Sequence, residues 1–237
     1  MRPRVAVAIP ALNEEAAVGF VVADLLRALA DLHPDVVVAD NGSTDRTGEV
    51  AAAAGARVVR EEERGYGAAC LAAIAALGEW DVLLFLDADR SDLPEEAPAV
   101  LAPLLAGDAD VVIGSRVLGR REPGALLPQQ RLGNLLATTL LRLLFGQRYT
   151  DLGPFRAVTR AAWEKLDMRD RTYGWTVELQ AKAPRAGLRI VEVPVSYRKR
   201  IGRSKVSGTL SGSAKAGAVI LATIFRLARW RPAGTRR

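Results

Sequence analysis

The chain has 237 residues, of which 49% are hydrophobic and 25% charged. This composition is typical of a folded globular protein and argues against wholesale disorder, and the length fits one large α/β domain or two small ones. Cys70 is the only cysteine and His33 the only histidine, which excludes an intramolecular disulfide and a histidine-rich metal site. Cys70 lies in an alanine-rich stretch and is predicted to be a small core residue.

The net charge of +6 is concentrated at the C-terminal end of the chain. From Arg189 onward there are 12 Lys and Arg residues and one acidic residue, Glu192, so this part carries +11 and residues 1–188 carry −5. A segment this basic needs an anionic partner. A nucleic acid, an anionic membrane and a phosphorylated substrate all qualify.

The first half of the chain alternates short apolar runs with helical patterns. Strands are predicted over residues 4–9, 36–39, 57–60, 81–86 and 110–113. Helices are predicted over residues 15–32, 44–54 and 94–105, with an alanine-rich helix that follows Gly65-Tyr66-Gly67 and ends at residue 77. Strands that alternate with helices in this way form right-handed βαβ units, so the sequence predicts an α/β fold with a mainly parallel sheet.

The second half is less regular. A Gly-, Pro- and Arg-rich loop over 116–129 leads into a leucine-rich helix over 131–145, and residues 151–160 are predicted to form a loop with a short strand. A helix over 173–185, a strand over 188–195, a basic stretch over 198–212 and an amphipathic helix over 213–230 follow. Without a repeat or a clear linker, we expect one domain over 1–212. Residues 213–237 are expected to belong to it or to contact a membrane peripherally.

The leucine-rich helix has a wide apolar face formed by Leu132, Leu135, Leu136, Leu140, Leu143 and Leu144. This face indicates a core helix, with a helix in a membrane interface as the alternative. The apolar stretches over 135–145 and 216–225 are shorter than the roughly 20 residues of a spanning helix. The N-terminus does not have the pattern of a signal peptide. We therefore expect a cytoplasmic protein, with any membrane contact peripheral at the inner face.

Two carboxylates follow the predicted strand over 81–86. Asp87 and Asp89 are two residues apart, so their side chains can converge beyond the carboxyl end of the strand, where open α/β sheets bind ligands. Carboxylates in this place suit a hard cation such as Mg²⁺, which fills its other positions with water and phosphate oxygens. The structural alternative is a βα loop in which Asp serves as a turn and cap residue.

Other polar loops are predicted at the same edge of the sheet. They are Asn13-Glu14, Asp40-Asn41 and Arg64-Gly65-Tyr66-Gly67. Gly65 and Gly67 enter a helix, where close backbone approach and unpaired N–H groups suit a phosphate. The partial GxGxxG pattern here is only weak evidence for a dinucleotide fold. Each loop alone is more often a plain turn, and Asp92 with Glu95 fits a helix capping box, but four such loops at one edge favour a site.

A resemblance covers nearly the whole chain. Its ordered motifs are Ile-Pro-Ala-Leu-Asn-Glu-Glu at 9–15, Asp-Asn-Gly-Ser-Thr-Asp at 40–45, Leu-Asp-Ala-Asp at 86–89, Gly-Ser-Arg at 114–116, Asp-Leu-Gly-Pro-Phe-Arg at 151–156, Glu-Val-Pro-Val at 192–195 and Gly-Arg-Ser-Lys at 202–205. In this order they resemble glycosyltransferase family 2, in particular the dolichol- and polyprenyl-phosphate mannose or glucose synthases. The resemblance implies a GT-A fold, a Rossmann-like three-layer α/β/α arrangement.

The resemblance also implies roles for the matching residues. Those implied to bind the nucleotide sugar are Pro10, Ala11, Asn13, Glu14, Asp40, Asp87, Ala88, Arg203 and Lys205. Mg²⁺ or Mn²⁺ is implied to bind Asp87 and Asp89, with Ser91 at the position of a third ligand. Asp89 and the basic residues Arg116 and Arg131 are implied to act in catalysis, since the basic positions face donor or acceptor phosphates.

The implied reaction is a metal-dependent, inverting transfer of a hexose, mannose or glucose, from a UDP- or GDP-linked donor. Metal and basic residues neutralise the departing diphosphate while an acceptor oxygen attacks C1 from the opposite face. A phosphate acceptor needs little help from a base, whereas a hydroxyl acceptor needs a carboxylate within reach. Asp151 and Glu178 are the candidates, although Asp151 equally fits a turn cap and Glu178 a solvated helix face.

The partners implied are a nucleotide-sugar donor and a polyprenyl phosphate at a membrane surface, since basic residues accompany two amphipathic helices. A small hydroxyl acceptor is the alternative, and a homo-oligomer stays open. A nucleic-acid-binding protein is a hypothesis of another class, but the basic segment shows no stacking platform and no nucleic-acid motif, so no nucleic acid is expected. A sugar nucleotidyltransferase is the third hypothesis.

Overall fold

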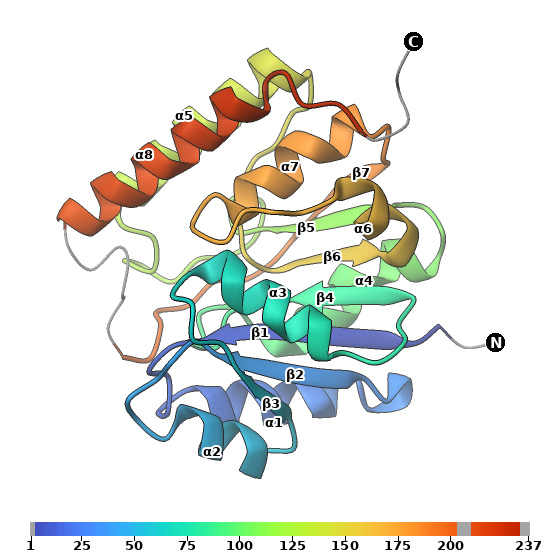
Figure 1. Cartoon of the computed structure of the whole chain (residues 1–237), viewed down its shortest axis with the longest axis vertical. Coiled ribbons are helices and arrows are strands. Elements are labelled where there is room, and N and C mark those ends of the chain that lie inside the picture. The colour runs from blue at the N-terminus through green and yellow to red at the C-terminus, as the bar shows by residue number, and fades with distance from the viewer. Residues whose placement is uncertain (1–2, 203–209, 233–237) are drawn as a thin grey trace.

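The structure, a computed structural model, describes residues 3–202 and 210–232 and is built on a seven-stranded sheet (Figure 1). The strand order is β3-β2-β1-β4-β6-β5-β7. The strands are β1 (Val5–Ala11), β2 (Asp35–Asp40), β3 (Arg57–Arg60), β4 (Val82–Phe85), β5 (Val111–Ser115), β6 (Arg156–Thr159) and β7 (Ile190–Pro194). All the strands predicted from the first half are present, with ends that differ by one or two residues.

One strand runs against the others. β6 pairs antiparallel with both β4 and β5, while the remaining neighbours pair in parallel. The sequence predicts a short strand in this region but not its central place. β6 has four residues and begins with a buried arginine, so its apolar signal is weak even though it lies inside the sheet.

Helices cover both faces of the sheet, which makes three layers. One core cluster lies under α1 (Val18–Ala28), α2 (Thr47–Ala53) and α4 (Ala97–Leu105). The other lies under α3 (Tyr66–Ala76), α5 (Pro128–Phe145), α6 (Arg160–Leu166), α7 (Trp175–Arg185) and α8 (Leu210–Leu227). The expected α/β/α fold with a mainly parallel sheet is confirmed. The predicted burial of Cys70 is confirmed as well, because its side chain is fully buried in the second cluster.

The leucine-rich helix α5 does not bury the face that its pattern suggests. Its buried side consists of Ala137, Thr138 and Leu141, whereas its large exposed side chains are Leu132, Leu135, Leu136 and Leu143. The expectation of an ordinary core helix is therefore wrong for most of the leucines. The physical reason is that α5 packs on α7 and α8 while Ala137, Thr138 and Leu141 form its buried side, which leaves these four leucines outside.

The last helix, α8, packs against α5 and α7, and its Ile224 and Leu227 belong to the core. Figure 1 shows α5 and α8 side by side along one side of the molecule. Within residues 3–202 and 210–232, no helix combines the length and the apolar character needed to cross a bilayer.

The two sides of α5 predict different costs for the same substitution. Leu141 is fully buried and Leu143 is 73% exposed. We expect Leu141→Ala to lower the free energy of unfolding by about 2–5 kcal/mol, because it leaves a cavity. Leu143→Ala should change it by less than about 0.5 kcal/mol. Urea unfolding followed by circular dichroism measures both, and equal costs would contradict the orientation of α5.

Candidate active site

A cavity of about 440 Å³ opens at the carboxyl ends of β1, β2 and β4. The register of the sheet brings these ends together, since Ala11 pairs with Asp40 and Ala8 with Phe85. The predicted site residues that line the cavity are Pro10, Ala11, Glu14, Gly65, Asp87, Ala88 and Asp89. Side chains from α3, from the segment before α7 and from α8 complete its wall.

Asp87 and Asp89 both face this cavity. Asp87 accepts a hydrogen bond from the hydroxyl of Tyr66 at 2.9 Å. Burial and the neighbouring charge of Asp89 raise the pKa of Asp87 to about 7, although the bond from Tyr66 opposes the shift. Asp89 Oδ1 accepts hydrogen bonds from the backbone N–H and the hydroxyl of Ser91, at 2.8 and 2.5 Å. Two carboxylates are thus held close together in a place that favours a cation.

Arg200, in the segment after β7, contacts the acidic residues of this cavity. Its guanidinium lies 3.2 Å from Asp89 Oδ2 and 2.6 Å from Glu14 Oε1. Backbone bonds hold the segment in place, since Ile201 N donates to Asp89 O and Arg198 N to Ser91 O, both at 3.0 Å. Sequence reasoning grouped Arg200 with the basic stretch. Its place in the cavity depends on a contact that spans more than one hundred residues.

The donor set fits a hard divalent cation only in part. Asp87 and Asp89 supply carboxylate oxygens, the ligand type that Mg²⁺ and Mn²⁺ prefer. Within the described part of the chain there is no cluster of three or more His, Cys, Asp or Glu residues that could hold a metal. A cation here would need water and ligand oxygens to complete its shell. Ser91 supports Asp89 in this structure, and its role as a third ligand stays a prediction.

Asn13 and Asp40 shape the loops beside the cavity. Asn13 has a left-handed φ of 52°, and its Oδ1 accepts a hydrogen bond from Thr44 N at 2.8 Å. Asp40 Oδ1 accepts one from Ser43 N at 2.8 Å. Neither residue is among those that line the cavity, whereas Asn41, which follows β2, is. The structure therefore gives Asn13 and Asp40 a loop-forming role, and their contact with a nucleotide stays a prediction.

Gly65, just before α3, and Gly67, in its first turn, allow close backbone packing. A Cβ on Gly65 or Gly67 would collide with a carbonyl oxygen, that of Arg171 or of Asp170. The N–H of Gly67 donates to Thr172 O at 3.2 Å, and Ala68 N donates to Arg171 O at 2.9 Å. The expectation that Gly67 offers a vacant N–H to phosphate is therefore wrong, because the protein already uses that donor.

Asp170 links the wall of the cavity to α8, a connection that sequence reasoning missed. Its Oδ1 accepts a hydrogen bond from Thr172 N at 2.8 Å, and its Oδ2 lies 3.0 Å from Arg226 Nη2. Its own N–H donates to Glu178 at 2.7 Å. Glu178 is buried beside Lys182 at 2.7 Å, so the expectation of a solvated face for Glu178 is wrong. Fully engaged with protein donors, Glu178 is unsuited to act as a base.

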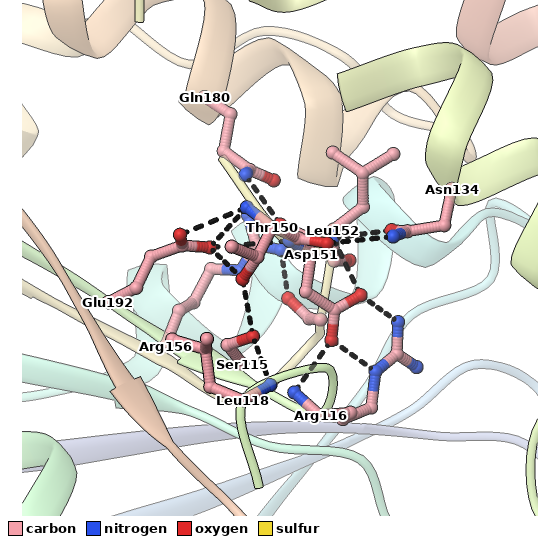
Figure 2. Close-up of polar contacts among 11 residues, drawn as sticks. Ser115, Arg116, Leu118, Asn134, Thr150, Asp151, Leu152, Arg156, Gln180 and Glu192 are labelled. Atoms are coloured by element: carbon pink, nitrogen blue, oxygen red, sulfur yellow. Dashed lines mark hydrogen bonds and ion pairs between the residues drawn. The ribbon is translucent and has the colours of Figure 1, made fainter. Parts of the chain in front are cut away.

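Arg116 and Asp151 form a buried ion pair (Figure 2). The charge of Arg116 acts on Asp87 and Asp92, which together with Asp89 we call the acidic centre. Arg116 Nε and Nη2 donate to the two oxygens of Asp151 at 2.7 and 2.8 Å, and the backbone N–H of Arg116 donates at 2.8 Å. Arg116 Cζ also lies 4.9 Å from the centre of the Tyr197 ring. Asp151 is fully buried and accepts these donors, so it positions Arg116 and is not arranged as a general base.

The loop that carries Asp151 is held from several elements, as Figure 2 shows. Thr150 N donates to Glu192 of β7 at 2.9 Å, Asn134 Nδ2 of α5 donates to Thr150 O at 2.9 Å, and Gln180 Nε2 of α7 donates to Asp151 O at 2.9 Å. Buried Arg156 donates to the carbonyl oxygen of Gly153. The motifs at 151–156 and 192–195 thus meet in one network.

The remaining predicted residues lie elsewhere. Arg131 is on the exposed first turn of α5 and is not among the described residues that line the cavity. Arg203 and Lys205 lie outside the described residues. The capping box at Asp92 is wrong, because the short 3₁₀ helix over Pro94–Glu96 has Leu93 at its N-cap and no side-chain cap. Asp92 is instead a buried carboxylate whose pKa is raised by burial and by Asp87 and Asp89.

The Arg116–Asp151 pair predicts a large stability effect. We expect Asp151→Ala to lower the free energy of unfolding by about 3 kcal/mol, because it leaves Arg116 buried without its partner. The matched control is Glu164→Gln, which breaks the exposed Arg160–Glu164 pair and should cost less than about 1 kcal/mol. Denaturant unfolding compares the two variants, and equal costs would contradict a buried positioning role for Asp151.

Comparison with known proteins places the chain in a family. The family model described as glycosyl transferase family 2 matches residues 6–167. The low-salt glycan biosynthesis hexosyltransferase Agl6 of Haloferax volcanii is 35% identical over 214 residues, which are 89% of this chain and 51% of that protein. The chain thus spans about half of that relative's length. The undecaprenyl-phosphate mannosyltransferase of Micrococcus luteus is 34% identical over 245 residues, with 96% of both chains covered.

A solved structure shares the architecture. The glucosyl-3-phosphoglycerate synthase of Mycobacterium tuberculosis, in complex with Mn²⁺, UDP and phosphoglyceric acid, has a TM-score of 0.75 and 27% identity, and the match covers 98% of this chain and 81% of that one. The chain therefore belongs to glycosyl transferase family 2, has the GT-A fold and is a glycosyltransferase.

Proposed function

We propose that this glycosyltransferase moves a hexose, mannose or glucose, from a UDP- or GDP-linked donor to a polyprenyl phosphate, with inversion at C1 and with Mg²⁺ or Mn²⁺. The observation that carries the proposal is the placement of Asp89 between Asp87 and Arg200 in the cavity. Carboxylates for a cation and a guanidinium for phosphate oxygens lie together there. A nucleoside diphosphate carries the charges that this arrangement complements.

The cavity offers separate surfaces to the parts of a donor. Near β1 and β2, Pro10, Ala11 and Asn41 carry no formal charge and suit the base and the ribose, while Glu14 and Arg64 also line this part of the cavity. Asp87 and Asp89 lie further along the same edge. The complex of the relative with Mn²⁺ and UDP supports a nucleoside-diphosphate donor with a divalent cation. The phosphates of the donor would meet Arg200, which lines the cavity beside Asp89.

The protein's own groups then act on the leaving diphosphate. A bound Mg²⁺ or Mn²⁺ would supply Lewis-acid stabilisation of its negative charge. Asp87 and Asp89 would hold that cation, while Arg200 donates to phosphate oxygens. Arg116, fixed by Asp151 and stacked on Tyr197, contributes a second oriented positive charge near the acidic centre. Oriented charges of this kind stabilise the transition state without reorganising during the reaction.

A phosphate acceptor fits a site in which both candidate bases are already occupied by protein donors. Asp151 and Glu178, the two carboxylates considered for this task, are buried and occupied by protein donors. A phosphate monoester is already an anionic nucleophile and does not need its proton removed. The lipid-phosphate substrate in the name of the Micrococcus luteus relative supports the same acceptor. The enzyme would then act at the inner face of a membrane, as a peripheral protein.

A small phosphorylated acceptor is the second candidate. The glucosyl-3-phosphoglycerate synthase was solved with phosphoglyceric acid, which is not a lipid. Such an acceptor would attack through a hydroxyl and would need a base. Asp151 and Glu178 are both occupied by protein donors, so this candidate is the weaker of the two.

Asp89 provides the direct test of the proposed reaction. We expect Asp89→Asn to lower lipid-linked transfer at least about hundredfold in saturating Mg²⁺ or Mn²⁺, because the cation and the diphosphate lose their anchor. The assay incubates labelled UDP-glucose and GDP-mannose with a polyprenyl phosphate and measures the label extracted into chloroform. A chelator should abolish transfer by the wild type.

The matched control is Asp81→Asn, at the opposite end of β4, where the carboxylate pairs with Arg4 on the surface. It should retain wild-type transfer, since exposed pairs contribute little. Full activity of Asp89→Asn would contradict the site. Transfer to 3-phosphoglycerate, with no lipid-linked product from either donor, would favour the second candidate.

A further inference from the structure

Most of the exposed large apolar side chains belong to one part of the chain and to α8. Of the eleven large hydrophobic residues that are exposed in the described part of the chain, eight lie between residues 117 and 143 or on α8. They are Val117, Leu118, Leu127, Leu132, Leu135, Leu136, Leu143 and Phe225. Scattered exposed leucines need no explanation, but four of these leucines lie on α5, and Phe225 lies on α8, which packs against α5. Such a group on adjacent helices marks an interaction surface.

Helical geometry makes four of these residues a single stripe. Leu132, Leu135, Leu136 and Leu143 recur at spacings of three, four and seven residues, which places them on one side of α5. Leu141 lies on the opposite side and is fully buried against the core. The stripe is therefore a fixed part of the folded surface, because α5 cannot turn inward without exposing Leu141.

The same region has no negative charge. Between Glu122 and Asp151, and again from Val193 to the C-terminus, the chain contains no Asp or Glu. The helices carry exposed cations instead: Arg131 and Arg142 on α5, and Lys215 on α8. We define the α5–α8 face as the four leucines, Phe225 and these three cations. Its apolar and basic character suits a surface that is both apolar and anionic.

We propose that the α5–α8 face binds the surface of an anionic lipid bilayer, with the leucine stripe inserted among the acyl chains and the cations at the headgroups. This inference rests on the proposed function, because a polyprenyl phosphate is reached only from a membrane. Its physical basis is the complementarity of charge and hydrophobicity. Basic residues near an anionic leaflet and apolar side chains inserted in it each add to the binding.

The face is continuous with the active site. Lys215 and Val219, on the first half of α8, line the cavity that contains Asp87 and Asp89. A bilayer against α5 and α8 would therefore lie beside the mouth of the cavity. A lipid phosphate could then enter along α8 while its chain stays in the membrane, which accounts for an apolar face at this place.

A second copy of the chain is a weaker match for the same face. In a twofold-symmetric dimer the face would meet a copy of itself, so its three cations would lie against a surface that carries the same cations and no carboxylate of α5 or α8. No acidic residue of α5 or α8 offsets that repulsion. An anionic bilayer removes the repulsion, whereas self-association increases it.

Vesicle sedimentation tests the proposal. The full chain is mixed with vesicles of phosphatidylglycerol and phosphatidylcholine, or of phosphatidylcholine alone. We expect strong binding to the anionic vesicles that weakens with salt. The double variant Leu135→Ser/Leu143→Ser should bind them at least about tenfold less. Arg142→Gln should bind about fivefold less to anionic vesicles and be unchanged on neutral ones.

The matched control is Val58→Ser/Leu105→Ser, which removes two exposed apolar side chains from β3 and α4. It should bind vesicles like the wild type. Both double variants should keep the wild-type affinity for UDP or GDP, which shows that they are folded. Wild-type vesicle binding by the leucine variant would overturn the proposal. So would a wild-type dimer that this variant converts to a monomer while vesicle binding is unchanged.

The outcomes separate this inference from the proposed acceptor. If vesicle binding depends on the leucines but no lipid-linked sugar forms, the polyprenyl phosphate acceptor is wrong and membrane binding by the α5–α8 face is supported. If lipid-linked sugar forms and vesicle binding does not depend on the leucines, membrane binding by the α5–α8 face is wrong and the polyprenyl phosphate acceptor is supported.

Discussion

The structure depends on the burial of negative charge at one end of β4. Asp89 and Asp92 are buried, Asp87 is close to both, and this crowding raises the pKa values of Asp87 and Asp92. Carboxylates gathered in this way are held together only where positive charge lies near them. Arg200 touches Asp89, and Arg116 lowers the pKa of Asp87 from a greater distance. The acidic centre therefore requires the basic residues around it.

Those basic residues explain why distant parts of the chain converge. Arg116 follows β5 and is fixed by Asp151, whose loop is held by α5, α7 and β7. Arg200 follows β7 and is placed by backbone bonds to the loop after β4. The antiparallel strand β6 brings the Asp151 loop between β4 and β5. The half of the sheet that differs from a simple parallel arrangement is thus the half that supplies the cations.

The fold was predictable because most of its signals are local. Apolar runs and their spacing mark the strands of the first half, and the pair Asp87 and Asp89 is visible as soon as the strand before it is identified. The central place of β6 was not predicted, because a four-residue strand that begins with Arg156 does not have the apolar pattern of a central strand. The leucines of α5 were assigned to the core since hydrophobicity alone does not distinguish a buried face from an exposed one.

The site was predictable only where its residues follow a strand directly. Arg200, Tyr66 and Asp170 act through contacts with residues far away in the sequence, so no local pattern identifies them. Asp151 differs from these residues, because its motif at 151–156 is visible in the sequence but its contact with Arg116 is not. Whether a carboxylate is a base or a positioning group depends on its donors, and those come from other elements of the fold.

The most direct test of the acidic centre is the position of a bound metal. Crystals grown with Mn²⁺ and UDP or GDP would give anomalous difference density at the manganese absorption edge. The account predicts a peak within coordination distance of Asp89, with the diphosphate between the metal and Arg200. A nucleotide bound in the cavity with no manganese at Asp89, or manganese bound at another place, would contradict it.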